Sequence, residues 1–157
     1  MIADRSIDAI LPAGASVLID TSVILAYLTG TEAISRLATE LFDRCLATGR
    51  NVGGVSMITV TELLVRPFRS GAAAVASVEG FVGHFADLRL LSIDYVIARE
   101  AARIRATTGL ATPDSLIAAT FVVGGQDVLV TNDASWPARL EGVVTGRPIL
   151  VLGDLLA

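Results

Sequence analysis

The stretch SVLIDTSVILAYLTG, residues 16–30, indicates the fold class of this chain. Its first part, Ser16 to Asp20, is a short apolar run that ends in a charge, as a buried parallel strand does where it leaves the core. Thr21 to Thr29 then predicts a short helix, which Gly30 closes. A strand that passes directly into a helix is the repeating unit of α/β folds with parallel sheets.

The rest of the chain repeats this alternation, with no internal repeat and no long linker. Further strands are predicted at residues 51–56, 88–93, 127–131 and 148–152. Helices are predicted at residues 32–48, 58–65 (ended by Pro67), 72–85, 95–107 and 113–123, with a short one around Trp136. We therefore expect a single domain over residues 1–157, an α/β/α sandwich whose mostly parallel sheet has about five strands.

Composition excludes several classes of protein. The chain has 157 residues, of which 53% are hydrophobic, and all 12 of its basic residues are arginine. Because lysine is absent, neither a Walker-A loop, a phosphatase of the haloacid-dehalogenase type nor a response-regulator receiver can be assembled. The formal net charge of −4 argues against a broad basic surface for nucleic acid.

The chain contains very few cysteine and histidine residues, which excludes several kinds of catalytic and metal-binding site. Cys45 is the only cysteine and His84 the only histidine, which leaves no disulfide and no zinc-binding cysteine pair. We interpret Cys45 as buried and His84 as a residue with a local partner.

No apolar run approaches the roughly 20 residues that span a bilayer. The charged segment 1–12 lacks the apolar core of a signal peptide, so a cytoplasmic location is expected.

Four carboxylates stand out because each lies in an apolar segment: Asp20, Glu62, Asp114 and Asp133. A cluster of like charges at the edge of a core repels itself unless a cation neutralises it. Hard divalent ions such as Mg²⁺ take oxygen ligands from a few carboxylates and keep several waters. The four positions together therefore predict a metal site, and a metal site in this setting suggests hydrolysis.

The predicted elements place three of these acids along one edge of the sheet. Asp20 ends its strand, Asp133 follows the strand 127–131, and Asp114 lies in a first helical turn for which Thr112 is the expected N-cap. Ligands of open parallel sheets bind outside the carboxyl ends of the strands. Each acid also has a structural explanation, as a helix N-cap, an Asx turn or a first-turn anion.

Glu62 has the strongest structural alternative. Thr59 and Arg66 lie three and four residues away on the predicted helix, so Glu62 could belong to a solvated face and pair with Arg66. Taken alone, Glu62 is therefore weak evidence for a site, and its weight comes from the other three acids.

Four segments resemble the PIN domain, and within it the VapC-type ribonuclease toxins of toxin–antitoxin pairs. They are VLIDTSVILAYL (17–28), ITVTELL (58–64), TPDSLIAAT (112–120) and LVTNDASW (129–136), and they occur in the order typical of that family. The resemblance implies a PIN fold and Mg²⁺- or Mn²⁺-dependent cleavage of RNA phosphodiester bonds. Many relatives carry a further acid after the Thr-Asn-Asp turn, where this chain has Ser135, so the number of metals stays open.

The resemblance also implies roles for individual residues. Asp20, Glu62, Asp114 and Asp133 carry over as the catalytic acids, with Asp20, Asp114 and Asp133 as the metal ligands. The polar residues expected to support the ligands or to orient the scissile phosphate are Thr21, Ser22, Thr131 and Asn132.

The resemblance implies partners as well. A VapC-type toxin cleaves an RNA substrate and is neutralised by a VapB-like antitoxin, and the large hydrophobic fraction of this chain favours a homodimer. Two alternatives stay open: a non-catalytic PIN module that binds proteins, and a PIN nuclease outside toxin–antitoxin systems.

Overall fold

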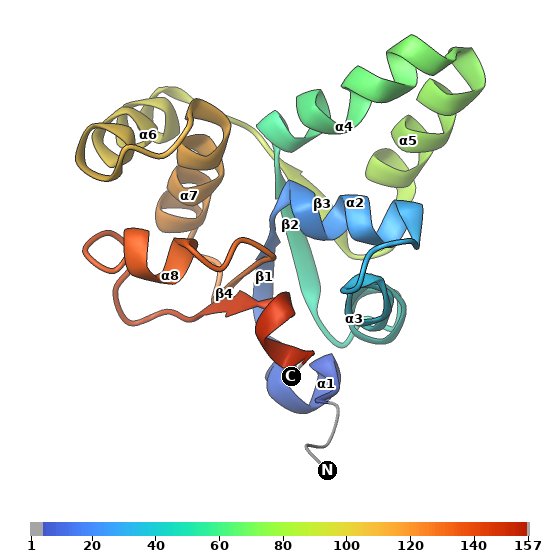
Figure 1. Ribbon diagram of the computed structural model, residues 1–157, viewed down its shortest axis with the longest axis horizontal. Coiled ribbons are helices and arrows are strands. Elements are labelled where there is room, and N and C mark those ends of the chain that lie inside the picture. The colour runs from blue at the N-terminus through green and yellow to red at the C-terminus, as the bar shows by residue number, and fades with distance from the viewer. Residues whose placement is uncertain (1–4, 157) are drawn as a thin grey trace.

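A five-stranded parallel sheet of order β3-β2-β1-β4-β5 forms the centre of the molecule (Figure 1). The structure is a computed structural model that describes residues 5–156. The strands are β1 (Ser16–Ile19), β2 (Val52–Ser56), β3 (Leu88–Leu91), β4 (Val128–Thr131) and β5 (Ile149–Val151). Every neighbouring pair is parallel, which confirms the predicted fold class and number of strands.

Strand β1 is buried from Val17 to Ile19 because both of its faces are covered there. Val17 and Ile19 point into one hydrophobic cluster, and Leu18 points into a second cluster on the opposite face. The register with β4 aligns Val17 with Val128 and Leu18 with Leu129, so residues that share a face lie side by side. This alternation divides the core into two halves, as the two-fold side-chain period of a strand requires.

Helices cover each face of the sheet (Figure 1). One layer holds α1 (Ile7–Ile10), α2 (Thr21–Thr29), α3 (Ser35–Thr39), η1 (Glu40–Leu46), α5 (Ala72–His84) and η2 (Leu152–Leu155). The other holds α6 (Tyr95–Thr108), α7 (Thr112–Gly124) and α8 (Trp136–Arg139). Helix α4 (Met57–Ser70) leaves the carboxyl end of β2 and forms a hairpin with α5. None of the described helices combines the length and apolarity that crossing a membrane requires.

Three element predictions were wrong in detail. Pro67 does not end α4, which continues to Ser70, because a proline in the last turn forfeits a single hydrogen bond there. The helix predicted over residues 32–48 is instead α3 followed by the π-helix η1, in which the Ala47 N–H donates to Phe42 five residues back. Helix α7 begins at Thr112 with Ala111 as N-cap, one residue earlier than predicted.

Residues near the N-terminus complete the core on the side of η1. Ile7 and Leu11 are almost fully buried. The Arg50 guanidinium donates to the carbonyls of Asp8 and Leu11, and the Glu40 carboxylate accepts the Ile7 N–H.

The structure confirms two predictions about single residues. Cys45 is buried, and His84 has a local partner in the Gly80 carbonyl.

Strand β2 contains two adjacent glycines, Gly53 and Gly54, and leucine side chains on opposite faces of the sheet pack closely against them. A Cβ atom on Gly53 would lie 2.8 Å from Leu46 Cδ1, and a Cβ on Gly54 would lie 2.8 Å from Leu91 Cδ1. The two glycines therefore let leucine side chains from opposite faces approach the backbone of the strand that leads to α4.

We predict that Gly53→Ala lowers the free energy of unfolding by about 1–3 kcal/mol, because the added methyl overpacks the core. Gly80→Ala is the matched control, since Gly80 lies in α5 and a methyl added there would have nothing within 4 Å. It should raise stability by up to about 1 kcal/mol through helix propensity. Urea denaturation of both variants measures the effects, and equal stability of the two would contradict this account of β2.

Candidate functional site

Asp20 occupies the junction between β1 and α2, where the central strand leaves the core. It is 5% exposed, and its N–H donates to the Val130 carbonyl at 2.9 Å, which continues the β1–β4 ladder. Its Oδ2 accepts hydrogen bonds from Ser22 Oγ at 2.6 Å and Thr131 Oγ1 at 2.8 Å. Asp20 has the N-cap position of α2 but makes no side-chain capping bond. Its carboxylate therefore faces the strand ends.

Burial raises the pKa of the Asp20 carboxyl, and the hydrogen bonds from Ser22 and Thr131 oppose that rise. Two further bonds fix this group of hydroxyls. The Asn132 N–H donates to Ser22 Oγ at 3.2 Å, and the Asp133 N–H donates to Thr131 Oγ1 at 3.1 Å. The Thr131–Asp133 turn after β4 is thus joined to the start of α2 through the two hydroxyls that hold Asp20.

Glu62 approaches this junction from helix α4. Its Oε2 accepts a hydrogen bond from Thr21 Oγ1 at 2.6 Å. The Thr21 hydroxyl also lies 2.9 Å from Thr59 Oγ1, and Thr59 is fully buried. The alternative in which Glu62 shares a solvated face with Thr59 and pairs with Arg66 is therefore wrong. Glu62 faces α2 because a buried pair of threonines joins the two helices.

Asp114 lies in the first turn of α7 and is half-buried. Burial raises the pKa of its carboxyl, and repulsion from Asp20, Glu62 and Asp133 raises it further. The other three acids predicted from the sequence therefore all act on Asp114, although the four come from separate parts of the chain. Arg139 acts in the opposite direction and lowers the Asp114 pKa.

Asp133 is the exposed member of the group. The pKa of its carboxyl is lowered, first by its hydrogen bond with the Ser135 side chain and also by the Ser135 N–H, which donates to Oδ1 at 2.8 Å. Arg139 and Trp136 lower it further. Trp136 is 1% exposed, and its Nε1 makes no hydrogen bond within residues 5–156. The bond from the Ser135 N–H to Oδ1 of Asp133 forms the Asx-type turn that was expected at this position.

The chemistry of this group suits a divalent cation. No ion pair between described residues includes any of the four acids, since the pairs formed there are Arg36–Glu40 and Arg103–Glu100. Within residues 5–156, no three acidic, histidine or cysteine side chains already lie close enough to form a metal cage. Carboxylates that repel one another separate when no cation is between them. An all-oxygen donor set at a partly open site fits Mg²⁺ or Mn²⁺.

The four polar residues predicted to support the acids make contact in two different ways, some through a side-chain hydroxyl and one through its backbone. Thr21, Ser22 and Thr131 each contact an acid through a hydroxyl group. Asn132 takes part through its backbone N–H, because its side-chain Oδ1 lies beside Gly153, 3.2 Å from where a Cβ there would be.

Sequence reasoning missed two residues that act on the acids. Thr59 reads as one of several β-branched residues in α4, and Arg139 reads as an ordinary exposed charge. For Arg139, the spacing along the chain could have predicted the position. Arg139 follows Ser135 by four residues in a short helix, which brings the arginine back toward the Asp133 turn.

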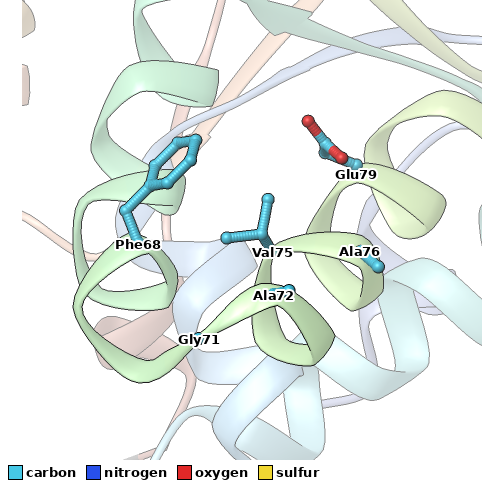
Figure 2. Close-up of a pocket in the computed structure, with 6 residues that line it drawn as sticks. All are labelled: Phe68, Gly71, Ala72, Val75, Ala76 and Glu79. Carbon is cyan, nitrogen blue, oxygen red and sulfur yellow. The ribbon is translucent and has the colours of Figure 1, made fainter.

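An apolar surface groove lies between α4 and α5, and none of the four acids lines it (Figure 2). It measures about 470 Å³ and is lined mainly by apolar side chains, which include Phe68, Ala72 and Val75, with Glu79 at one end. Phe68 is 69% exposed and also borders a second apolar groove on the outer face of α4. An exposed apolar surface of this kind marks a contact site for another molecule.

Comparison with known families gives one match. The PIN domain family matches residues 17–140, a range that includes all four acids. The match leaves out helix α1 and the end of the chain from β5 onward. No curated protein sequence is significantly similar to this chain.

Solved structures share the fold. A toxin of Mycobacterium tuberculosis, VapC20, described as cleaving the sarcin–ricin loop, is 20% identical, with a TM-score of 0.64, over 84% of this chain and 99% of that one. A toxin–antitoxin complex from Klebsiella pneumoniae is 22% identical (TM-score 0.62, 82% and 96% covered). DNA-bound VapBC from Salmonella typhimurium is 25% identical (TM-score 0.60, 88% and 98% covered).

We predict that Asp20→Asn stabilises the metal-free protein by about 0.5–2 kcal/mol, the usual gain when a strained functional group is relaxed. The raised pKa means that the native state binds a proton more tightly than the unfolded chain, so the ionised carboxylate destabilises the fold at neutral pH. The wild type should therefore gain stability relative to Asp20→Asn as the pH falls from 7 toward 5. Urea unfolding in EDTA measures both effects, and a less stable Asp20→Asn would contradict the argument.

Proposed function

Because the chain belongs to the PIN domain family, which matches residues 17–140, we propose that it is a metal-dependent endoribonuclease that hydrolyses RNA phosphodiester bonds. We further propose that it is the toxin of a VapBC-type toxin–antitoxin pair. The observation that carries the proposal is the setting of Asp114: burial and the charges of Asp20, Glu62 and Asp133 raise the pKa of its carboxyl, and no ion pair between described residues includes any of these acids.

Asp20, Asp114 and Asp133 would hold the Mg²⁺ or Mn²⁺ ion. When bound, such an ion supplies an activated water and neutralises charge that develops on the phosphate. Ser22 and Thr131 keep Oδ2 of Asp20 directed toward the strand ends. Glu62 and Asp133 are the candidate acceptors for the proton of the attacking water.

We predict that the purified chain cleaves total RNA in Mg²⁺ or Mn²⁺ and not in EDTA. Asp20→Asn and Asp114→Asn should each reduce the rate more than about 100-fold, since each removes a proposed ligand from the metal. Asp127→Asn is the matched control, because Asp127 is exposed and bonds Ser16 at the opposite end of β1.

Gel analysis of the RNA measures these rates. Wild-type cleavage by either ligand variant would show that the acids have been assigned wrongly. A wild type that cleaves nothing in either metal would favour the alternative of a non-catalytic module that binds proteins.

The apolar groove of the α4–α5 hairpin supports the antitoxin part of the proposal. Phe68 and Val65 are exposed at 69% and 45% on α4, and Phe68 borders apolar grooves on both sides. Solved structures of similar fold come from toxin–antitoxin complexes. We assign this surface to an apolar segment of a VapB-like antitoxin, which a neighbouring small gene would encode.

We predict that Phe68→Asp abolishes inhibition by that antitoxin and leaves RNA cleavage unchanged, because Phe68 is exposed and lies outside the acidic group. Val123→Asp is the control, since Val123 is 41% exposed on a different helix, α7, near the end of that helix opposite to Asp114. Cleavage assays with added antitoxin measure the inhibition. If Phe68→Asp is inhibited as fully as the wild type, the hairpin is not the contact surface, and the chain acts as a PIN nuclease with another form of control.

A homodimer is also part of the proposal. Tyr95 and Val96 leave an apolar patch at the start of α6 that the described residues do not cover. Light scattering at micromolar concentration tests this point, and a monomeric mass in the absence of a partner would contradict it.

A further inference from the structure

Arg139 lies beside the acidic site without forming an ion pair with it. It is the last residue of α8, and its N–H donates to the Ser135 carbonyl at 3.1 Å. Its Nη2 donates to the Thr108 carbonyl at 3.3 Å and would lie 3.8 Å from a Cβ on Gly109. The side chain therefore extends from α8, which follows Asp133, to the turn between α6 and α7.

That turn leads directly to the helix that carries Asp114, so the guanidinium lies between the segment that follows Asp133 and the segment that precedes Asp114. Its positive charge lowers the pKa of both Asp114 and Asp133. Arg139 is thus a cation that acts on both of these acids.

The guanidinium has capacity left for an external ligand. A guanidinium carries five N–H donors in a planar fork, and the side-chain bond that Arg139 makes within residues 5–156 uses a single donor toward a backbone carbonyl. The residue is exposed. An arginine that served only as an internal counter-ion would direct its fork at a carboxylate, as Arg103 does with Glu100 at 2.5 Å.

We propose that Arg139 binds a phosphate oxygen of the RNA strand next to the scissile phosphate. The proposal rests on the nuclease function proposed above, and it assigns Arg139 as a substrate-binding residue. A chain with a net charge of −4 and four clustered acids repels RNA over the range of the Debye length. The metal neutralises charge at the scissile phosphate, and a flanking phosphate needs a separate cation, for which the arginine fork has suitable geometry.

The charge of Arg139 should have opposite effects on the two ligands of the site. It attracts the RNA phosphate and repels the divalent ion. A variant without the charge should therefore bind RNA more weakly and bind the metal somewhat more tightly, whereas a local folding defect would weaken both.

The test compares Arg139→Gln with Arg103→Gln in an Asp20→Asn background that binds RNA without cutting it. Both substitutions remove one positive charge, and Arg103 lies on an exposed face of α6. Glutamine keeps an N–H donor for the Thr108 carbonyl. Fluorescence anisotropy of a labelled single-stranded RNA, titrated at several NaCl concentrations, gives the Kd and its salt dependence.

We expect Arg139→Gln to raise the Kd about 5- to 20-fold and to reduce the slope of log Kd against log salt by about 0.7, the value for one phosphate contact on a single strand. Arg139→Lys should recover part of the affinity, and Arg103→Gln should match its parent. In the otherwise wild-type chain, Arg139→Gln should bind Mn²⁺ about two- to fivefold more tightly by calorimetry. Equal Kd values and equal slopes for Arg139→Gln and its parent would overturn the proposal.

Cleavage by the wild type separates the two proposals. If the wild type cuts RNA while Arg139→Gln binds RNA like its parent, the nuclease function stands and the role of Arg139 is rejected. If Arg139→Gln binds RNA more weakly but the wild type cuts nothing in Mg²⁺ or Mn²⁺, the role of Arg139 in RNA binding stands and hydrolysis is rejected.

Discussion

The buried carboxylate of Asp20 is the constraint on which the rest of the structure depends. An ionised group at the edge of a core is unfavourable unless hydrogen bonds or a cation stabilise it. Here the bonds come from Ser22 on α2 and Thr131 on β4, and the backbone of Asp20 continues the ladder to Val130. The order of the strands makes this possible, because β1 and β4 are neighbours in the sheet although more than a hundred residues separate Asp20 from Thr131.

The acidic site and the apolar surfaces occupy different parts of the molecule. The acids come from the ends of β1 and β4 and from helices α4 and α7, and the apolar groove lies on the α4–α5 hairpin (Figure 2). Helix α4 links the two regions, because Glu62 near its middle bonds Thr21 while Phe68 near its end is exposed. One helix thus carries both a proposed catalytic acid and the proposed contact for an inhibitor, which gives a partner on the hairpin a direct route to the site.

Sequence alone predicted the fold, because the alternation of apolar strands and helices is a local feature with a strong pattern. It also singled out four acids, whose joint role as a metal site stays a prediction. It failed where tertiary contacts decide the outcome. Thr59 appeared solvated by helical spacing, and only the packing of α2 against α4 buries it. Pro67 appeared to end a helix that continues one more turn. Arg139 had only its spacing from Ser135 as a signal, since its contact with the α6–α7 turn depends on how that turn meets α8. Asn132 was assigned a side-chain role, but its backbone N–H makes the contact.

The most direct test of the central claim is isothermal titration of Mn²⁺ into the purified wild type and Asp114→Asn. If the four acids form one divalent-cation site, the wild type binds with measurable heat and saturates, and the variant, which lacks the acid on which the charges of the other three converge, binds at least about tenfold more weakly. Identical binding curves for the two proteins, or no binding by the wild type, would contradict the account.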